Sequence, residues 1–361
     1  MATTGGLLRI LRTIDFASGQ ICIGDANTVA SLLSANTILI GSSATIGSGS
    51  PNAIAIGTRI ILGDDSPSCV VVGVGSSVDT VARGVVVGSG SSISPSSDNS
   101  VVVGASSGAF SVSAVVVGYS ASVAPLSDNS VLVGSNSTLT GLGSVLVGAG
   151  SAIVGSSNVV VGSGASSSFD GAVVVGHGAV TLSPNAVVIG LSSHVADDCS
   201  GSIAIGLGAT INPDSSNCVV MGAGSSVSTT VNGTVIGSSS TMNADSNNSV
   251  IVGQSVTLTG LGSVAIGNSA SVTGNNSQAY GSGATVVGDN TVVFGSVAAP
   301  VLNLHVQTNL GANLDLVAFN SSLVVANHST CMTLLYKNAL GVVTSVPVTV
   351  DDVTGALTVA L

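Results

Sequence analysis

The stretch Asn-Ser-Val-Val-Val-Gly at residues 99–104 decides the fold, because close variants of it recur along most of the chain. Asn-Ser-Val-Leu-Val-Gly follows at 129–134 and Asn-Ser-Val-Ile-Val-Gly at 248–253. The spacing between successive blocks is 14 to 17 residues, and such a fixed period is the signature of a repeat architecture. The blocks end at Gly24, Gly41, Gly57, Gly73, Gly88, Gly104, Gly118, Gly134, Gly148, Gly162, Gly176, Gly190, Gly206, Gly222, Gly237, Gly253, Gly267, Gly281 and Gly295.

Each repeat predicts two strands. The two residues before the glycine are apolar in all nineteen copies, and the third is Val or Ile except at Thr234 and Gln278. A further apolar residue follows five positions after the glycine, except at Ser167 and Thr181. A coil of 14 residues is too short for a three-sided hexapeptide helix, which needs roughly 18 residues per coil. We therefore predict an all-β, parallel β-roll solenoid of about 19 rungs, each with a long strand, a glycine corner, a short strand and a turn.

The longer strand raises a packing problem. Successive side chains of a strand point to opposite faces, so a strand with three apolar residues in a row is expected to be buried on both faces. One face can pack against the short strand of its own rung, but the other has no partner within the chain, and its exposure would exceed what a monomer tolerates. We expect the middle residues to be buried in an interface between copies. These residues are Val71, Val86, Val102, Val116, Leu132, Leu146, Val160, Val174 and Val188.

Four blocks identify a family resemblance. Residues 99–104, 129–134, 248–253 and 262–267 resemble the Asn-Ser-Val-Ala-Ile-Gly core of the YadA-like head of trimeric autotransporter adhesins. The resemblance covers roughly residues 21–299. It implies a left-handed parallel β-roll in which three chains pack around one axis, displayed on a surface to bind host ligands. A signal peptide, a heptad stalk and a membrane-barrel segment, which that family also carries, are not found in this sequence.

The repeat divides the chain into three predicted parts. Residues 21–299 form the β-roll. Residues 1–20 precede it and are interpreted either as a cap on the first rung or as a docking peptide. Residues 300–361 leave the period, and alternating segments at 301–306, 314–319, 323–326, 333–336, 342–350 and 357–361 predict a small C-terminal β-sandwich-like domain.

Composition excludes several classes of function. Charged residues are 6% of the chain, against roughly 25% in an ordinary domain, and the net charge is −11. Nucleic-acid binding needs clustered Lys and Arg, which this chain lacks. No apolar run approaches 18 residues, so we expect no membrane insertion, and the N-terminus predicts no secretory signal. The five cysteines form no CxxC motif and are interpreted as reduced thiols, at Cys22, Cys69, Cys199, Cys218 and Cys331.

The ionisable residues do not predict a catalytic centre. His177, His194, His305 and His328 are isolated and have no partner at metal-ligand spacing. The acidic pairs at 64–65, 197–198 and 351–352 are interpreted as solvated turn charges rather than as the separated carboxylates of a glycosidase. We expect no enzymatic activity and no cofactor.

One pair of carboxylates is a candidate ion site. Asp198 and Asp214 each stand eight residues after a repeat glycine, so both should lie in the same turn on adjacent rungs. The favoured interpretation is that the two carboxylates splay into water. The alternative is a Ca²⁺ ion held between them.

These observations favour a structural function. We predict a homotrimeric surface fibre or adhesin of a virion, phage or surface layer, with a bacterial cell surface as the alternative location. Its expected partners are its own copies, a capsid or other surface-assembly protein at either end, and a host receptor or glycan. The alternatives are the head fragment of a bacterial trimeric autotransporter adhesin and a tailspike-type glycan-processing protein.

Overall fold

The computed structural model describes residues 11–15, 19–29, 34–295, 332–337, 343–350 and 357–359. The chain divides into two compact units, Met1–Leu302 and Asn303–Leu361. All described secondary structure in both units consists of β-strands.

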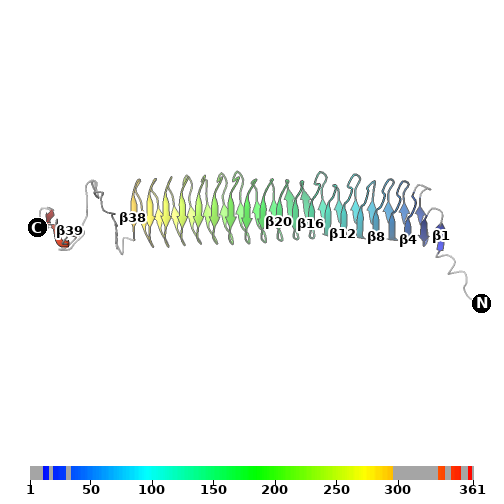
Figure 1. Ribbon diagram of the computed structural model, residues 1–361, viewed down its shortest axis with the longest axis horizontal. Helices are drawn as coiled ribbons and strands as arrows, with labels where there is room; N and C mark the ends of the chain where they lie inside the picture. The colour runs from blue at the N-terminus through cyan, green and yellow to red at the C-terminus, as the bar shows by residue number, and fades with distance from the viewer. Residues whose placement is uncertain are drawn as a thin grey trace, which may run out of the picture. The chain divides into compact units, whose positions relative to one another are not determined.

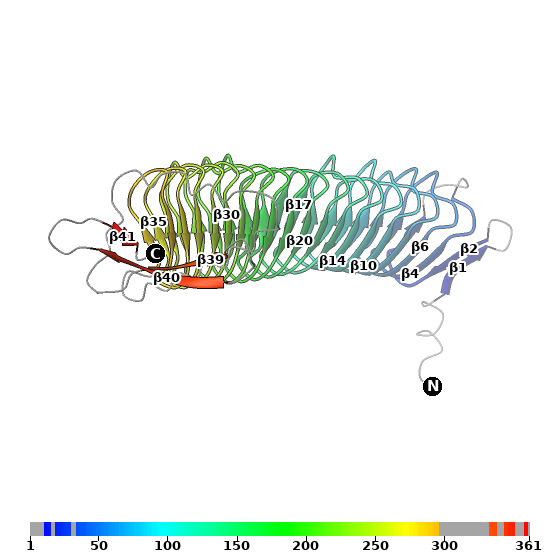
Figure 2. The same cartoon turned by 60° about the vertical axis from the view of Figure 1, so that its left-hand side comes forward.

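The first unit is a parallel β-solenoid, as the repeat predicts. Nineteen long strands form one ladder and eighteen short strands form another, and the coils stack in single file (Figure 1). We call the two ladders the long-strand sheet and the short-strand sheet. The chain alternates between them, so each rung contributes one strand to each sheet. Figure 2 shows the successive coils in register along this unit.

The long-strand sheet contains the repeat blocks. Its strands are β2 (Gln20–Ile23), β4 (Ile38–Ser42), β6 (Ile54–Thr58), β8 (Val70–Val74), β10 (Val85–Ser89), β12 (Val101–Ala105), β14 (Val115–Tyr119), β16 (Val131–Val133), β18 (Val145–Val147), β20 (Val159–Val161), β22 (Val173–Val175), β24 (Val187–Ile189), β26 (Ile203–Ile205), β28 (Val219–Met221), β30 (Thr234–Ile236), β32 (Val250–Val252), β34 (Val264–Ile266), β36 (Gln278–Tyr280) and β38 (Val292–Phe294).

The short-strand sheet contains the second apolar position of each repeat. Its strands are β3 (Thr28–Val29), β5 (Thr45–Ile46), β7 (Ile61–Leu62), β9 (Ser77–Val78), β11 (Ser92–Ile93), β13 (Gly108–Ala109), β15 (Ser122–Val123), β17 (Thr138–Thr140), β19 (Ala152–Val154), β21 (Ser166–Ser167), β23 (Val180–Thr181), β25 (His194–Val195), β27 (Thr210–Ile211), β29 (Ser226–Val227), β31 (Thr241–Met242), β33 (Thr257–Leu258), β35 (Ser271–Val272) and β37 (Thr285–Val286).

The repeat glycines lie directly above one another. Gly88 pairs with Gly104, and Gly104 with Gly118. Gly104 has a φ of +146°, and a Cβ atom on it would overlap the carbonyl oxygen of Gly118 in the next rung. A side chain at this corner would therefore push neighbouring rungs apart, which explains why glycine recurs here.

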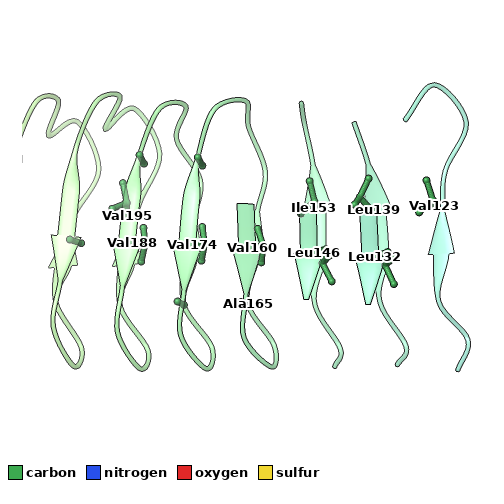
Figure 3. Packing of buried hydrophobic residues seen from close by; sticks show 14 of the residues in the cluster. Val123, Leu132, Leu139, Leu146, Ile153, Val160, Ala165, Val174, Val188 and Val195 are labelled. Atoms are coloured by element: carbon green, nitrogen blue, oxygen red, sulfur yellow. The ribbon is translucent and has the colours of Figure 1, made fainter. Parts of the chain in front are cut away.

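The core lies between the two sheets of a single chain. Middle residues of the long strands, such as Leu132, Leu146 and Val160, face apolar residues of the short strands, such as Leu139 and Ile153 (Figure 3). All five side chains are fully buried. Each coil thus adds about two large apolar side chains to a thin, continuous core.

Columns of small polar side chains complete the interior at the corners. Ser144 donates its backbone N–H to Ser130 Oγ (3.2 Å), and Ser130 Oγ donates to the Gly141 carbonyl (2.9 Å). A hydroxyl in one rung therefore satisfies a backbone amide of the next, as buried polar groups require. Two buried side-chain atoms among the described residues have no hydrogen-bond partner, Ser97 Oγ and Asn158 Nδ2.

The first edge of the long-strand sheet is covered. β1 (Leu11–Asp15) pairs antiparallel with β2, so β2 is not left as an open edge at this end.

In the second unit, β39 (Met332–Lys337), β40 (Val343–Val350) and β41 (Leu357–Val359) form an antiparallel sheet. The segments predicted at 301–306, 314–319 and 323–326 lie outside the described residues.

Candidate functional site

The outer side of the long-strand sheet is a uniform surface that runs along the solenoid. In each long strand, the first and third residues of the apolar triplet point outward, while the middle residue points into the core. We call the two outward columns the apolar face. They consist of Val and Ile apart from Thr234, Gln278, Met221, Tyr280 and Phe294, and they contain no charged residue. Val103 and Val117 in the third position are 37% and 36% exposed.

This finding corrects the predicted interface residues. The prediction that the middle residues contact another copy is wrong, because their side chains are fully buried inside one chain. The residues concerned are Val71, Val86, Val102, Val116, Leu132, Leu146, Val160, Val174 and Val188. The unpartnered stripe consists instead of the residues on either side of them, so it is two columns wide.

The corner residues explain this orientation. Ser100 and Ser130, which precede the apolar triplets, are fully buried, and the alternation of a strand places the residue two positions later on the same side. Ser, Ala, Cys or Gly occupies this corner position in most rungs. The recurrence of Ser, Ala or Cys at this position was the sequence signal that the middle residue faces inward.

The size of the apolar face sets it apart from an ordinary monomer surface. Nineteen strands spaced about 4.8 Å apart cover about 86 Å, and three residues span about 10 Å, which gives an area of about 860 Å². The largest apolar patch on a typical monomer is about 300–600 Å². A standard protein interface buries about 800 Å² on each partner.

The outer side of the short-strand sheet has a different chemistry. From β27 to β37 its outward positions carry uncharged hydroxyl and amide groups, all partly or fully exposed, except Val287 directly after β37, which is 76% exposed. The hydroxyl and amide residues are Thr210, Asn212, Ser226, Ser228, Thr241, Asn243, Thr257, Thr259, Ser271, Thr273 and Thr285. Some are linked between rungs: Asn212 Nδ2 donates to Ser228 Oγ (2.8 Å), and Asn243 Nδ2 to Thr259 Oγ1 (2.7 Å). We call these residues the hydroxyl face.

Carboxylates in the turns accept hydrogen bonds from backbone amides. Asp98 Oδ1 accepts the backbone N–H of Ala82 (2.8 Å), and Asp128 Oδ1 accepts that of Val112 (2.9 Å). Each carboxylate thus satisfies an amide of the preceding rung. The pair at 64–65 is exposed, and Asp64 accepts hydrogen bonds from the backbone and the hydroxyl of Ser48.

Asp198 and Asp214 occupy the same turn on adjacent rungs. The Asp214 N–H donates to the carbonyl of Asp197 (3.3 Å), and both Asp198 and Asp214 are exposed with positive φ. Among the described residues, no group of three or more His, Cys, Asp or Glu side chains is placed to hold a metal ion.

The two described histidines lie on adjacent rungs. His177 is exposed, and His194 lies half-buried in β25. Burial lowers the pKa of His194, and the nearby Asp197 carboxylate partly opposes that shift. His305, His328 and the acidic pair at 351–352 lie outside the described residues.

The described cysteines are not joined by disulfide bonds. Cys69, Cys199 and Cys218 are buried, Cys22 is partly buried, and Cys331 lies outside the described residues. Burial raises the pKa of the Cys69, Cys199 and Cys218 thiols, which keeps them neutral at pH 7. Cys218 replaces a corner serine: its Sγ accepts the Gly233 N–H (3.3 Å) and donates to the Thr230 carbonyl (3.0 Å).

A shallow depression of about 250 Å³ lies near β13. Its lining contains no His, Cys, Asp or Lys, so it offers hydroxyl and aromatic contacts rather than acid–base chemistry. The lining residues are Gly90, Ser92, Ser106, Ser107, Gly108, Phe110, Ser120, Ala121 and Ser122.

Comparison with known proteins adds no family assignment. No protein-family model matches the chain, and no curated protein sequence matches it significantly. Within the part of the chain that the structure describes, there is no helix of the length and apolarity that crossing a membrane requires.

Proposed function

We propose that this chain is the subunit of a homotrimeric surface fibre. The observation that carries the proposal is the apolar face, because about 860 Å² of uncharged surface built mainly from stacked Val and Ile is a surface that water disfavours. A second copy of the chain is the occupant that matches it, because a copy has the same length, the same rung spacing and the same apolar chemistry. The resemblance of residues 99–104 and their variants to the YadA-like head supports three copies around one axis.

This arrangement would give the two sheets different roles. The long-strand sheets would pack together around the axis, and the short-strand sheets would face the solvent. The hydroxyl face would then be available to a ligand along several rungs. Its uncharged hydroxyl and amide groups are suited to hydrogen bonding with a glycan, so we propose an adhesin whose ligand is a glycan or a glycosylated receptor.

We place the fibre on the surface of a virion or another particle, with a bacterial cell surface as the second location. The support for surface display is the same resemblance, together with a repetitive rod whose length can be extended by adding coils. Immunogold labelling of intact particles or cells with antibodies against the hydroxyl face tests this location. Labelling restricted to the interior of broken particles or cells would contradict it.

The assembly is tested by charge substitutions on opposite sides of the solenoid. The triple variant Val117→Asp, Val147→Asp, Val161→Asp places three carboxylates on the apolar face. We expect it to remain folded but to be monomeric, because an interface cannot bury unpaired charges. The matched control, Ser122→Asp, Ser166→Asp, Ser226→Asp, places the same charges on the outer side of the short strands and should remain trimeric. Trimeric apolar-face variants, measured by light scattering, would refute the assigned interface.

A further inference from the structure

A periodic apolar face does not by itself fix how copies align along the axis. Val101 pairs with Val115 and Val115 with Val131, so a copy displaced by one rung would meet the same side chains. This displacement would remove contacts between the copies only at the two ends of the apolar face. A residue that breaks the apolar pattern is needed to specify one alignment.

Gln278 carries the one amide side chain among the described residues of that face. It stands in the first position of β36, between Val264 of β34 and Val292 of β38. Its Oε1 accepts a hydrogen bond from Tyr280 Oη (2.8 Å), and within the described part of the chain its Nε2 has no hydrogen-bond partner. The side chain is half-buried on the apolar face, the surface that the proposed trimer would cover.

Tyr280 is itself held in place. Its ring stacks on Phe294 of the next rung, with centroids 5.2 Å apart and planes 14° from parallel. The stacked ring fixes the hydroxyl that binds Gln278 Oε1, and this contact orients the Gln278 amide. Gln278, Tyr280 and Phe294 therefore form one unit at the C-terminal end of the apolar face.

We propose that Gln278 sets the axial register between copies of the chain. This inference rests on the proposed trimer. When the three chains are level, Nε2 of one Gln278 can donate to Oε1 of Gln278 in the next copy, and a ring of three hydrogen bonds satisfies all three amides. When one chain is displaced by a rung, its amide meets Val264 or Val292 of the neighbouring copy and is buried without a partner. A single polar residue specifies register in coiled coils in the same manner.

The test moves the glutamine by one rung. The double variant Val264→Gln, Gln278→Val carries the same residues in a shifted position. It is unfolded and refolded together with wild-type chains, and the trimers are counted by native mass spectrometry. We expect mixed trimers to fall about tenfold below the statistical share. A level mixed trimer leaves amides unpaired, and a mixed trimer displaced by one rung to pair them loses the contacts of its end rungs. The control Val264→Ile, which keeps Gln278, should mix statistically with wild type.

Statistical mixing of the double variant, with both chains trimeric, would overturn the inference and leave the proposed function intact. Monomers in every sample would instead overturn the proposed function. If the double variant does not fold, the single variant Gln278→Val gives a second test. We expect it to form trimers whose three chains end at different levels in electron cryomicroscopy. Level, threefold-symmetric Gln278→Val trimers would contradict the register assignment.

Discussion

Val102 and Val103 are neighbours in β12, yet Val102 is fully buried while Val103 is 37% exposed. The first lies in the core of one chain, and the second lies on the apolar face. Two identical side chains one position apart therefore have different roles, one in the core of the chain and one on its surface. Val102 stabilises the fold of a single chain, and Val103 is available to another copy.

Single substitutions at these two positions should separate folding from assembly. Val102→Asp buries a charge in the core and should destabilise the chain by several kcal/mol. Val103→Asp should leave the circular dichroism spectrum unchanged and weaken association. Chemical denaturation and light scattering measure the two effects. Equal loss of folding in both variants would show that the two side chains do not differ in this way.

Asn158 ends a run of corner serines and leaves one buried hydrogen-bond donor without a partner. Its Oδ1 accepts the Ala172 N–H (2.8 Å), but its Nδ2 is buried without a partner. Asn158→Ser keeps an acceptor and removes the unpaired donor, so we expect the free energy of unfolding to rise by about 1–2 kcal/mol. Asn158→Ala removes the acceptor as well and should be less stable than Asn158→Ser. A serine variant less stable than wild type in denaturant titrations would contradict this account.

The buried thiols predict a loss of stability at high pH. Burial raises the pKa of Cys69, Cys199 and Cys218 above that of a free thiol. Their neutral form is favoured in the fold, so this contribution is fully present below the unfolded thiol pKa and is lost as the pH rises through the folded pKa. The melting temperature should therefore fall in the alkaline range.

Cys218→Ser provides the matched control for that prediction. Serine restores the common corner residue and can make the same two hydrogen bonds, so the variant should fold and show a smaller alkaline decrease in melting temperature. An unchanged alkaline decrease in Cys218→Ser would assign the effect to other groups.

Calcium should not stabilise the solenoid. Asp198 and Asp214 are exposed to water, and two carboxylates supply only part of the six to eight oxygens that Ca²⁺ takes. We expect equal melting temperatures in millimolar Ca²⁺ and in chelator, for wild type and for the double variant Asp198→Asn, Asp214→Asn. A higher melting temperature in Ca²⁺ that disappears in the double variant would establish the ion site instead.

The rung architecture could be predicted because glycine and apolar residues recur at fixed positions. The corner at Gly104 admits no side chain, and Leu139 and Ile153 are buried five positions after their glycines, as expected. The direction of the triplet could not be read from hydropathy, because Val101, Val102 and Val103 are the same residue. Only the small buried residue before the triplet distinguishes the two faces.

The sequence predicts that an apolar surface exists, but it does not predict which residues form it. The sequence indicates an unpartnered apolar stripe, and the structure assigns it to two outer columns rather than one. The Gln278–Tyr280 contact depends on the geometry of neighbouring side chains, so it cannot be predicted from a sequence pattern. Gln278 was visible only as an exception in the repeat.

The mass of the native particle in solution tests the central claim most directly. We expect light scattering to give three times the chain mass of 34.4 kDa for wild type, independent of concentration over the measured range. The Val117→Asp, Val147→Asp, Val161→Asp variant should give the mass of one folded chain. A folded wild-type chain that stays at 34.4 kDa at every concentration would contradict the account, because the apolar face would then be stable in water without a partner.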